Sequence, residues 1–372
     1  MKQLSVEYLL ALHSIYSLLG QRLSRLMEYF GDAEECWHNE TEWGDALEIK
    51  GAALKNLLTE KHCVDLHEVY ETFLKSGAKF VTLADDNYPK KLRDIYDPPY
   101  LLYYKGTLPE ESAVSIAMIG SRRATSYGLQ ATEYISRQLA EQGALIVSGL
   151  ARGIDSAGHR GALDVGGKSV GVLGCGVDVV YPPENKKLFR SVEENGCIIS
   201  EFSLQTNPLP RNFVVRNRLV SGLSDGVVVV EATKKSGTQI TVDFALEQGK
   251  SIFAVPGPIF NPLSQGTHKL IRDDNVKLVT CADDIMAEFE SFNLFENPYE
   301  QSGEQLQMFP GLAEEFSSLE KQIWEYLVTA RHFNDIAAEI EVDAANLAPV
   351  LTVMEIRGYI SRQDGQYYIR KN

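Results

Sequence analysis

The sequence predicts an α/β protein built on a mostly parallel sheet, and two observations in its middle section support that prediction. Short runs of Val, Ile and Leu recur with helical segments between them, as expected for alternating strands and helices. These runs do not alternate apolar with polar residues, which indicates strands buried on both faces. The pattern is that of a Rossmann-type sheet, whose ligands bind at the carboxyl ends of the strands.

Residues 1–75 are predicted to form an all-helical, SAM-like module. Apolar residues from Val6 to Leu19 follow a near-helical period, and Gly20 and Gly31 interrupt it. Short helical hairpins of this kind either pack against other modules or bind the DNA backbone, and the acidity of this region opposes phosphate contact. Residues 76–105 are predicted to be a connector with several prolines, ending in a strand over 100–104.

Residues 106–289 are predicted to form the Rossmann-type domain. A helix is also expected after Asp155. The predicted strands are 114–119, 144–147, 169–173, 197–199, 227–230, 252–255 and 276–279, and the other predicted helices are 127–142, 184–194 and 239–248.

Residues 290–312 lose this periodicity and are predicted to be a linker. Residues 313–372 are predicted to form a winged-helix-like module, with helices over 318–327, 333–340 and 343–357. A hairpin is expected around Asp364-Gly365. The module either contacts a protein or binds DNA. The third helix carries Asp343, Glu355 and few basic residues, which suits a major-groove reader poorly.

Composition narrows the class of protein. The 372 residues carry a net charge of −15, but the 166 residues from Ser115 to Thr280 hold 18 basic and 15 acidic side chains. The excess of acidic residues therefore lies in the flanking regions. A local basic groove in the middle section is compatible with the negative net charge of the whole chain. No apolar run reaches the roughly 18 residues that span a bilayer, and no signal peptide is recognisable. Five scattered cysteines fit free thiols in a reducing cytoplasm, and no metal-ligand spacing is present.

Four loops at the ends of predicted strands could bind phosphate. The central one, Ser148 to Asp155, places two glycines and Arg152 on a strand-to-helix turn, where free N–H groups and the helix dipole favour an anion. A tight turn without a ligand is the alternative. The other loops are Gly120-Ser121-Arg122-Arg123, Lys234-Lys235-Ser236-Gly237-Thr238 and Ser264-Gln265-Gly266-Thr267.

A fifth stretch, residues 210–221, carries Arg211, Arg216 and Arg218 around Phe213. Arginines suit phosphate, and an aromatic ring can stack on an unpaired base. Alternatively, Phe213 belongs to the core and the arginines pair with acids such as Glu201 and Asp225. Composition does not choose between the two.

An enzyme is the rival class. The sequence lacks the glycine-rich fingerprints of bound NAD and of a P-loop. Nucleotide-processing hydrolases on a related sheet have a P-G-G-x-G-T-x-x-E pattern, but here Thr241 stands at the position of the catalytic acid. Glu231 and His159 are the remaining acid-base candidates, and both fit packing or hydrogen-bonding roles better. A scaffold that binds only proteins is a third possibility.

The series of motifs resembles the DNA-processing protein A family, also called DprA or Smf. The resemblance runs in order and at close spacing through most of the middle domain. The motifs are Gly120-Ser121-Arg122, Ser148 to Asp155, Tyr181-Pro182-Pro183-Glu184-Asn185, Phe213 with Arg216-Asn217-Arg218, Lys235-Ser236-Gly237-Thr238, Pro256-Gly257 and Gly266-Thr267.

The resemblance implies a cytoplasmic, homodimeric protein that binds single-stranded DNA during natural transformation. It also implies loading of the recombinase RecA and relief of the block set by single-strand-binding protein. Arg122 matches a family arginine on the DNA backbone, and Phe213 matches an aromatic near the strand. A lysine of some members is replaced here by Pro210, with Arg211 next to it.

The expected DNA or phosphate site therefore comprises eighteen residues, with no catalytic residue, cofactor or metal. They are Gly120, Ser121, Arg122, Ser148, Gly149, Arg152, Gly153, Arg211, Phe213, Arg216, Asn217, Arg218, Lys235, Ser236, Gly237, Thr238, Gly266 and Thr267.

Overall fold

The computed structural model describes residues 3–109, 114–234, 236–274, 276–293, 318–327, 331–340, 342–356, 359–363 and 367–370. The chain divides into two compact units, Met1–Asn297 and Pro298–Asn372. The α/β prediction is confirmed in the first unit. None of the described helices is long and apolar enough to span a membrane.

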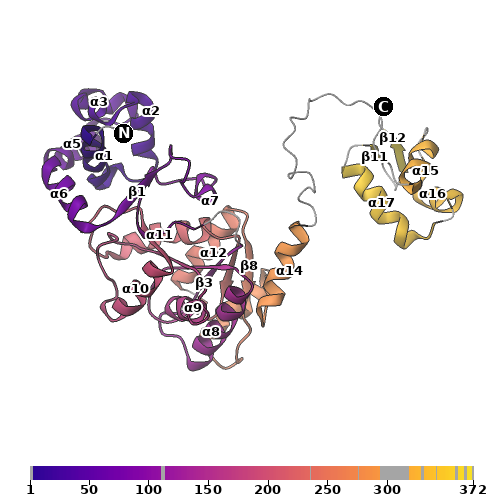
Figure 1. Ribbon diagram of the computed structural model, residues 1–372. Coiled ribbons are helices and arrows are strands. Elements are labelled where there is room, and N and C mark those ends of the chain that lie inside the picture. Colours follow the sequence, from indigo (N-terminus) through magenta and orange to yellow (C-terminus); the bar gives the residue numbers. More distant parts are fainter. Residues whose placement is uncertain are drawn as a thin grey trace. The chain divides into compact units, whose positions relative to one another are not determined.

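The first unit is built on one sheet, which Figure 1 shows beneath the N-terminal helices. Strands β6, β5, β4, β3, β7, β8 and β9 run parallel, and β2 and β1 extend the β6 edge in antiparallel pairing. Across the sheet the order is β1 (Lys79–Thr82), β2 (Leu101–Gly106), β6 (Gly196–Ser200), β5 (Ser169–Val172), β4 (Leu145–Ser148), β3 (Ser115–Ile119), β7 (Gly226–Val229), β8 (Ser251–Ala254) and β9 (Lys277–Leu278). The predicted connector thus supplies two strands of the sheet, of which β1 was not expected.

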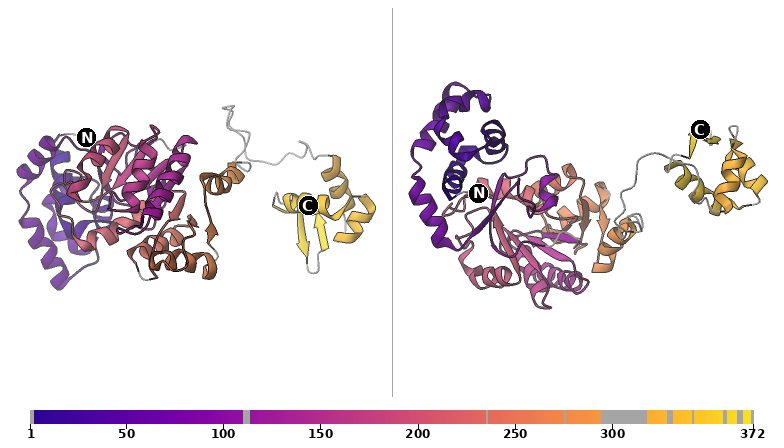
Figure 2. Two further views of the ribbon diagram at one scale, coloured as in Figure 1. Left: turned by 90° about the horizontal axis from the view of Figure 1, so that it is seen from below. Right: turned by 45° about the horizontal axis from the view of Figure 1, so that its top comes forward.

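Helices cover both faces of this sheet (Figure 2). One face carries α8 (Ser126–Glu141), α9 (Ile154–Leu163), α10 (Lys186–Glu194) and α14 (Ala282–Asn293). The other carries α7 (Lys90–Arg93), α11 (Pro210–Gly222), α12 (Gly237–Glu247) and α13 (Gln265–Asp273). Successive side chains of β3 pack into the hydrophobic cores on opposite faces of the sheet. Ile116 and Met118 belong to the core on one face, and Ala117 and Ile119 belong to the core on the other. The strands are therefore buried on both faces, as the unalternated runs predict.

The order of the strands reverses at β3. From there the chain proceeds through β4, β5 and β6 on one side, and through β7, β8 and β9 on the other. The connections after β3 and β7 therefore separate on opposite faces and leave a crevice at the carboxyl ends of these two neighbouring strands.

The N-terminal helices share a core with the sheet. Leu9 and Trp43 belong to the same cluster of buried side chains as Leu101 and Tyr103 of β2 and Phe189 of α10. The helical prediction for this region is confirmed. Its helices are α1 (Gln3–Ser14), α2 (Gln21–Phe30), α3 (Ala33–His38), α4 (Trp43–Ala46), α5 (Gly51–His62) and α6 (Leu66–Ser76), with 3₁₀ turns η1 (Tyr16–Leu18) and η2 (Glu40–Glu42).

The second unit is small and has its own core, made by residues such as Ile323, Ile336 and Leu351. It contains α15 (Ser318–Tyr326), α16 (Phe333–Ile340) and α17 (Ala344–Ile356), and a sheet of β10 (Arg331–His332), β12 (Tyr367–Arg370) and β11 (Ile360–Gln363) in that order. The expected Asp364-Gly365 turn lies outside the described residues.

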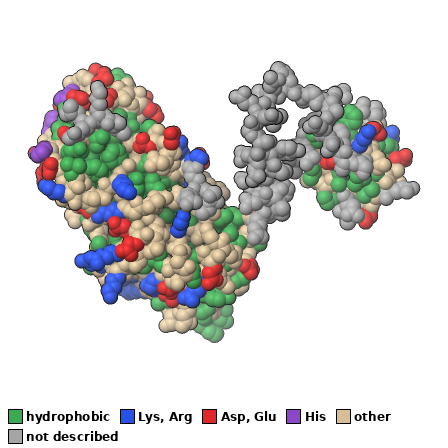
Figure 3. Space-filling view, in the orientation of Figure 1, with side chains coloured by type: hydrophobic (Ala, Val, Ile, Leu, Met, Phe, Trp, Pro, Cys, Tyr) green, Lys and Arg blue, Asp and Glu red, His purple; other side chains and the backbone are tan. Residues whose placement is uncertain are grey.

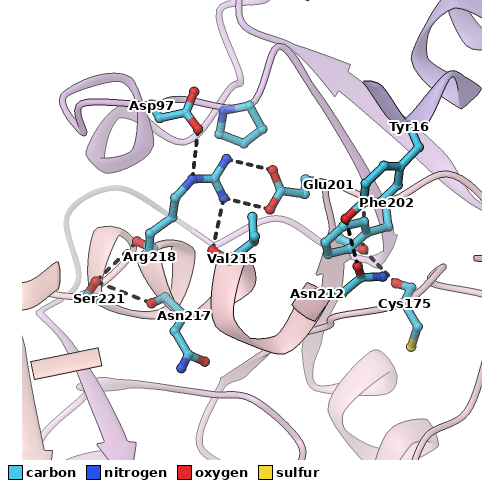
Figure 4. Close-up of polar contacts among 12 residues, drawn as sticks. Tyr16, Asp97, Cys175, Glu201, Phe202, Asn212, Val215, Asn217, Arg218 and Ser221 are labelled. Atoms are coloured by element: carbon cyan, nitrogen blue, oxygen red, sulfur yellow. Dashed lines mark hydrogen bonds and ion pairs between the residues drawn. The ribbon is translucent and has the colours of Figure 1, made fainter. Parts of the chain in front are cut away.

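A buried ion pair joins α11 to the residue that follows β6 (Figure 4). Arg218 Nη1 and Nη2 donate to the two Glu201 carboxylate oxygens at 2.6 and 2.7 Å. The Arg218 Nε lies 3.4 Å from the Asp97 carboxylate. Burial alone lowers the pKa of Arg218, but Glu201 and Asp97 outweigh it and raise the pKa. Arg218 thus stabilises the fold, and Glu201 is one of the acids anticipated for it.

Replacing Arg218 with Met is expected to leave Glu201 charged, buried and unpaired, and to lower the free energy of unfolding by about 3–5 kcal/mol. Chemical denaturation of the wild type and the variant measures this difference in the free energy of unfolding. Arg211→Ala is the control, since it removes an exposed arginine and is expected to cost about 1 kcal/mol or less. A combined Arg218→Met and Glu201→Leu protein should recover much of the lost stability. Equal losses for the Arg218 and Arg211 variants would contradict this role.

Candidate functional site

A cavity of about 610 Å³ opens at the carboxyl ends of β3, β4 and β7, where the strand order reverses. Parts of the loops after these strands line it, together with one side of α11 and the start of α12. The lining residues include Gly120, Ser121, Arg122, Arg123, Gly149, Asp155, Tyr181, Phe213, Arg216, Asn217, Ser236, Gly237 and Thr238.

The loop after β3 is fixed by its backbone, and its arginines remain exposed. A side chain at Gly120 would lie 2.6 Å from Ile154 Cγ1 and 2.9 Å from the Glu231 carbonyl, so the position requires glycine. Ser121 N donates to that carbonyl at 2.7 Å. The Arg122 and Arg123 side chains are exposed at the cavity. Two cations are thereby held where a phosphate can approach.

The central loop after β4 uses two of its N–H groups internally. Gly149 N and Ala151 N donate to Asp155 Oδ2 at 3.1 and 3.4 Å. Because this carboxylate occupies the place that we expected for a phosphate, these two amides support the loop rather than an external anion. Leu150 between them has a φ of 53°, a strained backbone conformation for a non-glycine residue.

Arg216 forms part of the cavity wall behind this loop. Its side chain is 3 % exposed and Nη1 donates to the Val172 carbonyl at 2.5 Å. A Cβ at Gly149 would overlap its guanidinium, so only glycine allows the loop to lie this close. Burial lowers the pKa of Arg216, and the Asp155 charge opposes that shift. Nε has no hydrogen-bond partner among the described residues, which leaves a buried donor at the cavity.

Phe213 presents a half-buried ring between cations and another ring. The Arg122 and Arg216 guanidinium carbons lie 5.4 and 5.9 Å from its centroid, and the Tyr181 ring lies 5.4 Å away. Gly174 packs beneath it, since a Cβ there would be 2.8 Å from Phe213 Cδ1. Phe213 is therefore not a fully buried core residue, and its ring contributes surface to the cavity.

The N-terminus of α12 offers a free anion site. Ser236 precedes the helix, but its hydroxyl makes no capping hydrogen bond and has no partner among the described residues. Gly237 and Thr238 begin the helix, and a Cβ built on Gly237 would meet no other described segment of the chain within 4 Å. The N–H groups of a first helical turn and the helix dipole favour an anion here. Lys235 lies outside the described residues.

Other expected site residues lie away from this cavity. Ser148 is buried and donates to the Met118 carbonyl, while Gly153, at φ 76°, packs against the Ser121 carbonyl. Gly266 and Thr267 are buried behind Ala232 and Ser264.

Three of the expected arginines do not line this cavity, although Arg152 lies beside it in a small pocket that it shares with Arg122 and Phe213. Arg152 is exposed and pairs with Glu184, and Arg211 lies over the Tyr16 ring at 4.4 Å. Arg218 belongs to the buried pair with Glu201 described above.

Several lining residues lie outside the expected set, and three of them carry polar or aromatic side chains next to the expected ones: Arg123, Asp155 and Tyr181. Arg123 directly follows Arg122, and Asp155 and Tyr181 lie within the motifs that carry the resemblance. Their positions in or next to a motif were therefore the sequence signal that could have identified them as site residues. Asp155 is the sole acid among the described residues that line the cavity, against Arg122, Arg123 and Arg216. On the face drawn in Figure 3, by contrast, basic side chains are scattered among acidic ones.

The acid-base candidates serve the fold. The Glu231 carboxylate accepts from Thr125 N and Oγ1 at 2.8 and 2.6 Å, at the start of α8. His159 is fully buried against Ser169, and burial lowers its pKa to about 3. No cluster of metal-binding side chains occurs among the described residues.

Gly149→Ala is expected to force the Arg216 guanidinium from its place and to cost about 1–3 kcal/mol of stability, as overpacking does. Gly237→Ala is the matched control, because it adds the same methyl group in open space at the same cavity. Thermal unfolding of the two variants compares them. A Gly149→Ala protein that melts with the wild type would show that the contact with Arg216 is looser than described.

Comparison with known proteins identifies the family. The model of the DNA recombination-mediator protein A family matches residues 79–290. The DNA processing protein DprA of Streptococcus pneumoniae is 38 % identical over 274 residues, which are 73 % of this chain and 94 % of that protein. The DprA of Bacillus subtilis is 38 % identical over 66 % of this chain and 83 % of that protein.

Two solved structures agree with this assignment. That of DprA from S. pneumoniae has a TM-score of 0.66 at 35 % identity and covers 76 % of this chain and 96 % of its own. That of DNA processing protein A from Helicobacter pylori, whose single-stranded DNA binding mode has been described, has a TM-score of 0.51 at 32 % identity and covers 58 % of this chain and 98 % of its own. The chain therefore belongs to the DNA recombination-mediator protein A family.

Proposed function

We propose that this chain binds single-stranded DNA in the cavity between the loops after β3, β4 and β7. The observation that carries the proposal is the joint placement of exposed Arg122, the half-buried Phe213 ring and the free N-terminus of α12 around one cavity. Arginines and helix N-termini bind phosphate, and an aromatic ring stacks on an unpaired base. The single-stranded DNA binding described for the H. pylori relative supports the same assignment.

The geometry favours a single strand over a duplex. Phe213 is half-buried within the cavity, so a base must leave its stack to reach the ring. The bases of a duplex are paired and stacked, whereas those of a single strand are free to splay out. Contacts to phosphates and to one ring face carry little sequence information, so we expect weak sequence preference.

The further roles rest on the family. Its description as recombination mediators supports loading of RecA onto the bound strand and relief of the block by single-strand-binding protein during natural transformation. We propose that the chain does this in the cytoplasm as a homodimer formed through the Rossmann-type domain, 106–289. The winged-helix-like module, 313–372, follows the linker predicted over 290–312 and is proposed to serve partner contacts.

We also propose that the chain is not an enzyme. The hydrolase alternative needs an acid on the helix after the third loop, where Thr241 lies almost fully buried. Asp155, which lines the cavity, accepts two loop amides, and Glu231 accepts from Thr125. Both carboxylates are engaged in holding loops.

Arg122→Glu is expected to weaken binding of a thymidine oligonucleotide and to reduce the slope of log affinity against log salt by about 0.7 for a lost phosphate contact. Fluorescence anisotropy at several salt concentrations measures both. Arg137→Glu is the control. Arg137 is also an exposed arginine, but it lies on α8 outside the cavity and pairs with Asp164. Loss of affinity to the same degree in both variants would indicate a general charge effect and contradict the site.

Phe213→Ala is expected to weaken binding by about 1–3 kcal/mol if the ring stacks on a base. The salt slope should stay nearly unchanged, because no charge is lost. Melting of the free variant is measured alongside. A variant that melts early but binds normally while folded would remove Phe213 from the DNA contacts.

A fragment of residues 1–297 is expected to bind single-stranded DNA within about twofold of the full chain, since the cavity lies entirely in this compact unit. Titration of both proteins under one buffer checks this. A folded fragment that binds far more weakly would assign DNA contacts to residues 298–372.

A further inference from the structure

A β-turn after β8 presents two apolar side chains to solvent. Asn261 N donates to the Pro258 carbonyl at 3.0 Å, which places Ile259 and Phe260 at the two central positions. Their exposed fractions are 73 % and 92 %. Exposure of an entire phenyl ring at a turn tip forgoes the stabilisation that its burial would give.

This turn is held firmly in place. His268 Nε2 lies 2.9 Å from the Gly257 carbonyl, and Asn261 Oδ1 accepts from Leu263 N at 3.0 Å. Gly257 packs so closely on Ser264 that a Cβ there would overlap the Ser264 side chain. The Phe260 ring is therefore displayed by a rigid support, as a stacking surface requires.

The turn is also fastened to the edge of the DNA cavity. Tyr127, in the first turn of α8 and four residues beyond Arg123, donates to the Pro256 carbonyl at 2.6 Å. Asn261 Nδ2 lies 3.4 Å from Glu231 Oε1, whose carboxylate also holds Thr125. Leu263 lines the cavity itself, and three residues of chain span at most about 11 Å. Phe260 thus stands beside the cavity, on the side of α8 and α13.

Acidic residues are absent from the segment that contains the turn. The segment from Gln248 to Arg272 has no Asp or Glu, and the nearby cations Lys269 and Arg272 pair with Asp274 and Asp273 directly after it. A strand leaving the Arg122–Arg123 loop would meet no carboxylate from this segment on its way to the turn.

We propose that Phe260 is a second base-stacking position, which receives an unpaired base of the same single strand just outside the cavity. The inference rests on the proposed single-stranded DNA binding and extends it. Phe213 then stacks one base inside the cavity and Phe260 stacks another at its margin. Ile259 beside it widens the apolar surface under that base. Stacking of this kind tolerates all four bases, because every base has a π face.

The test compares Phe260→Ala with Tyr96→Ala in the full chain. Tyr96 is a matched control, since its side chain is also 92 % exposed and is absent from the residues that line the cavity. Each protein is titrated with an oligothymidylate and with an abasic oligonucleotide of equal length. Phe260→Ala should weaken oligothymidylate binding by roughly 5-fold or more, leave abasic binding unchanged and preserve the salt slope. Tyr96→Ala should bind both as the wild type does.

A second variant reports on the contact directly. Phe260→Trp should bind normally, and its added fluorescence should be quenched by oligothymidylate but not by the abasic strand. Unchanged oligothymidylate affinity in Phe260→Ala would overturn the proposal, and so would equal weakening for both strands. A shift of Phe260→Ala to a smaller species in sedimentation would assign the turn to contacts between copies instead. A wild-type chain that binds neither strand would refute the proposed function itself.

Discussion

One wall of the cavity depends on a close approach between the Gly149 backbone and the Arg216 guanidinium. Arg216 comes from α11, Gly149 from the loop after β4 and the Val172 carbonyl from β5, so three separate segments meet there. Asp155, which holds the loop amides, supplies the opposing charge that keeps a nearly buried arginine favourable. This arrangement places the charged guanidinium of Arg216 at the cavity while its side chain stays almost fully buried. The Nε of Arg216 has no hydrogen-bond partner among the described residues.

The site proposed at this cavity is compatible with the acidic composition of the chain. The net charge of −15 is a sum over the whole sequence, whereas binding depends on the few charges near the ligand. Around the cavity Arg122, Arg123 and Arg216 face a single carboxylate among the described lining residues. The acidic residues outside the cavity weaken nonspecific attraction to duplex DNA. They do not prevent binding at a local site that contacts both a phosphate and an unpaired base.

The strands and most helices were predictable because short apolar runs and the glycines that end them are local signals. The edge strand β1 was harder to predict. β1 is four residues long and pairs only with β2, so nothing in its own pattern separated it from a connector. The arginines near Phe213 show a different limit. Arg211, Arg216 and Arg218 look alike in sequence, but a helix turns them toward Tyr16, the cavity and Glu201 respectively. Tertiary packing determines which partner each of these arginines contacts. It also determines that the Gly149 and Ala151 N–H groups donate to Asp155 within the loop.

The central claim is that the single strand passes through the cavity where the strand order reverses. Photocrosslinking of the full chain to a strand containing 5-iododeoxyuridine, followed by mass spectrometry of the linked peptides, tests it most directly. The account predicts that the dominant crosslink falls on Phe213 or Tyr181, the two rings that line the cavity. Dominant crosslinks confined to the N-terminal helices or to residues 298–372 would contradict it.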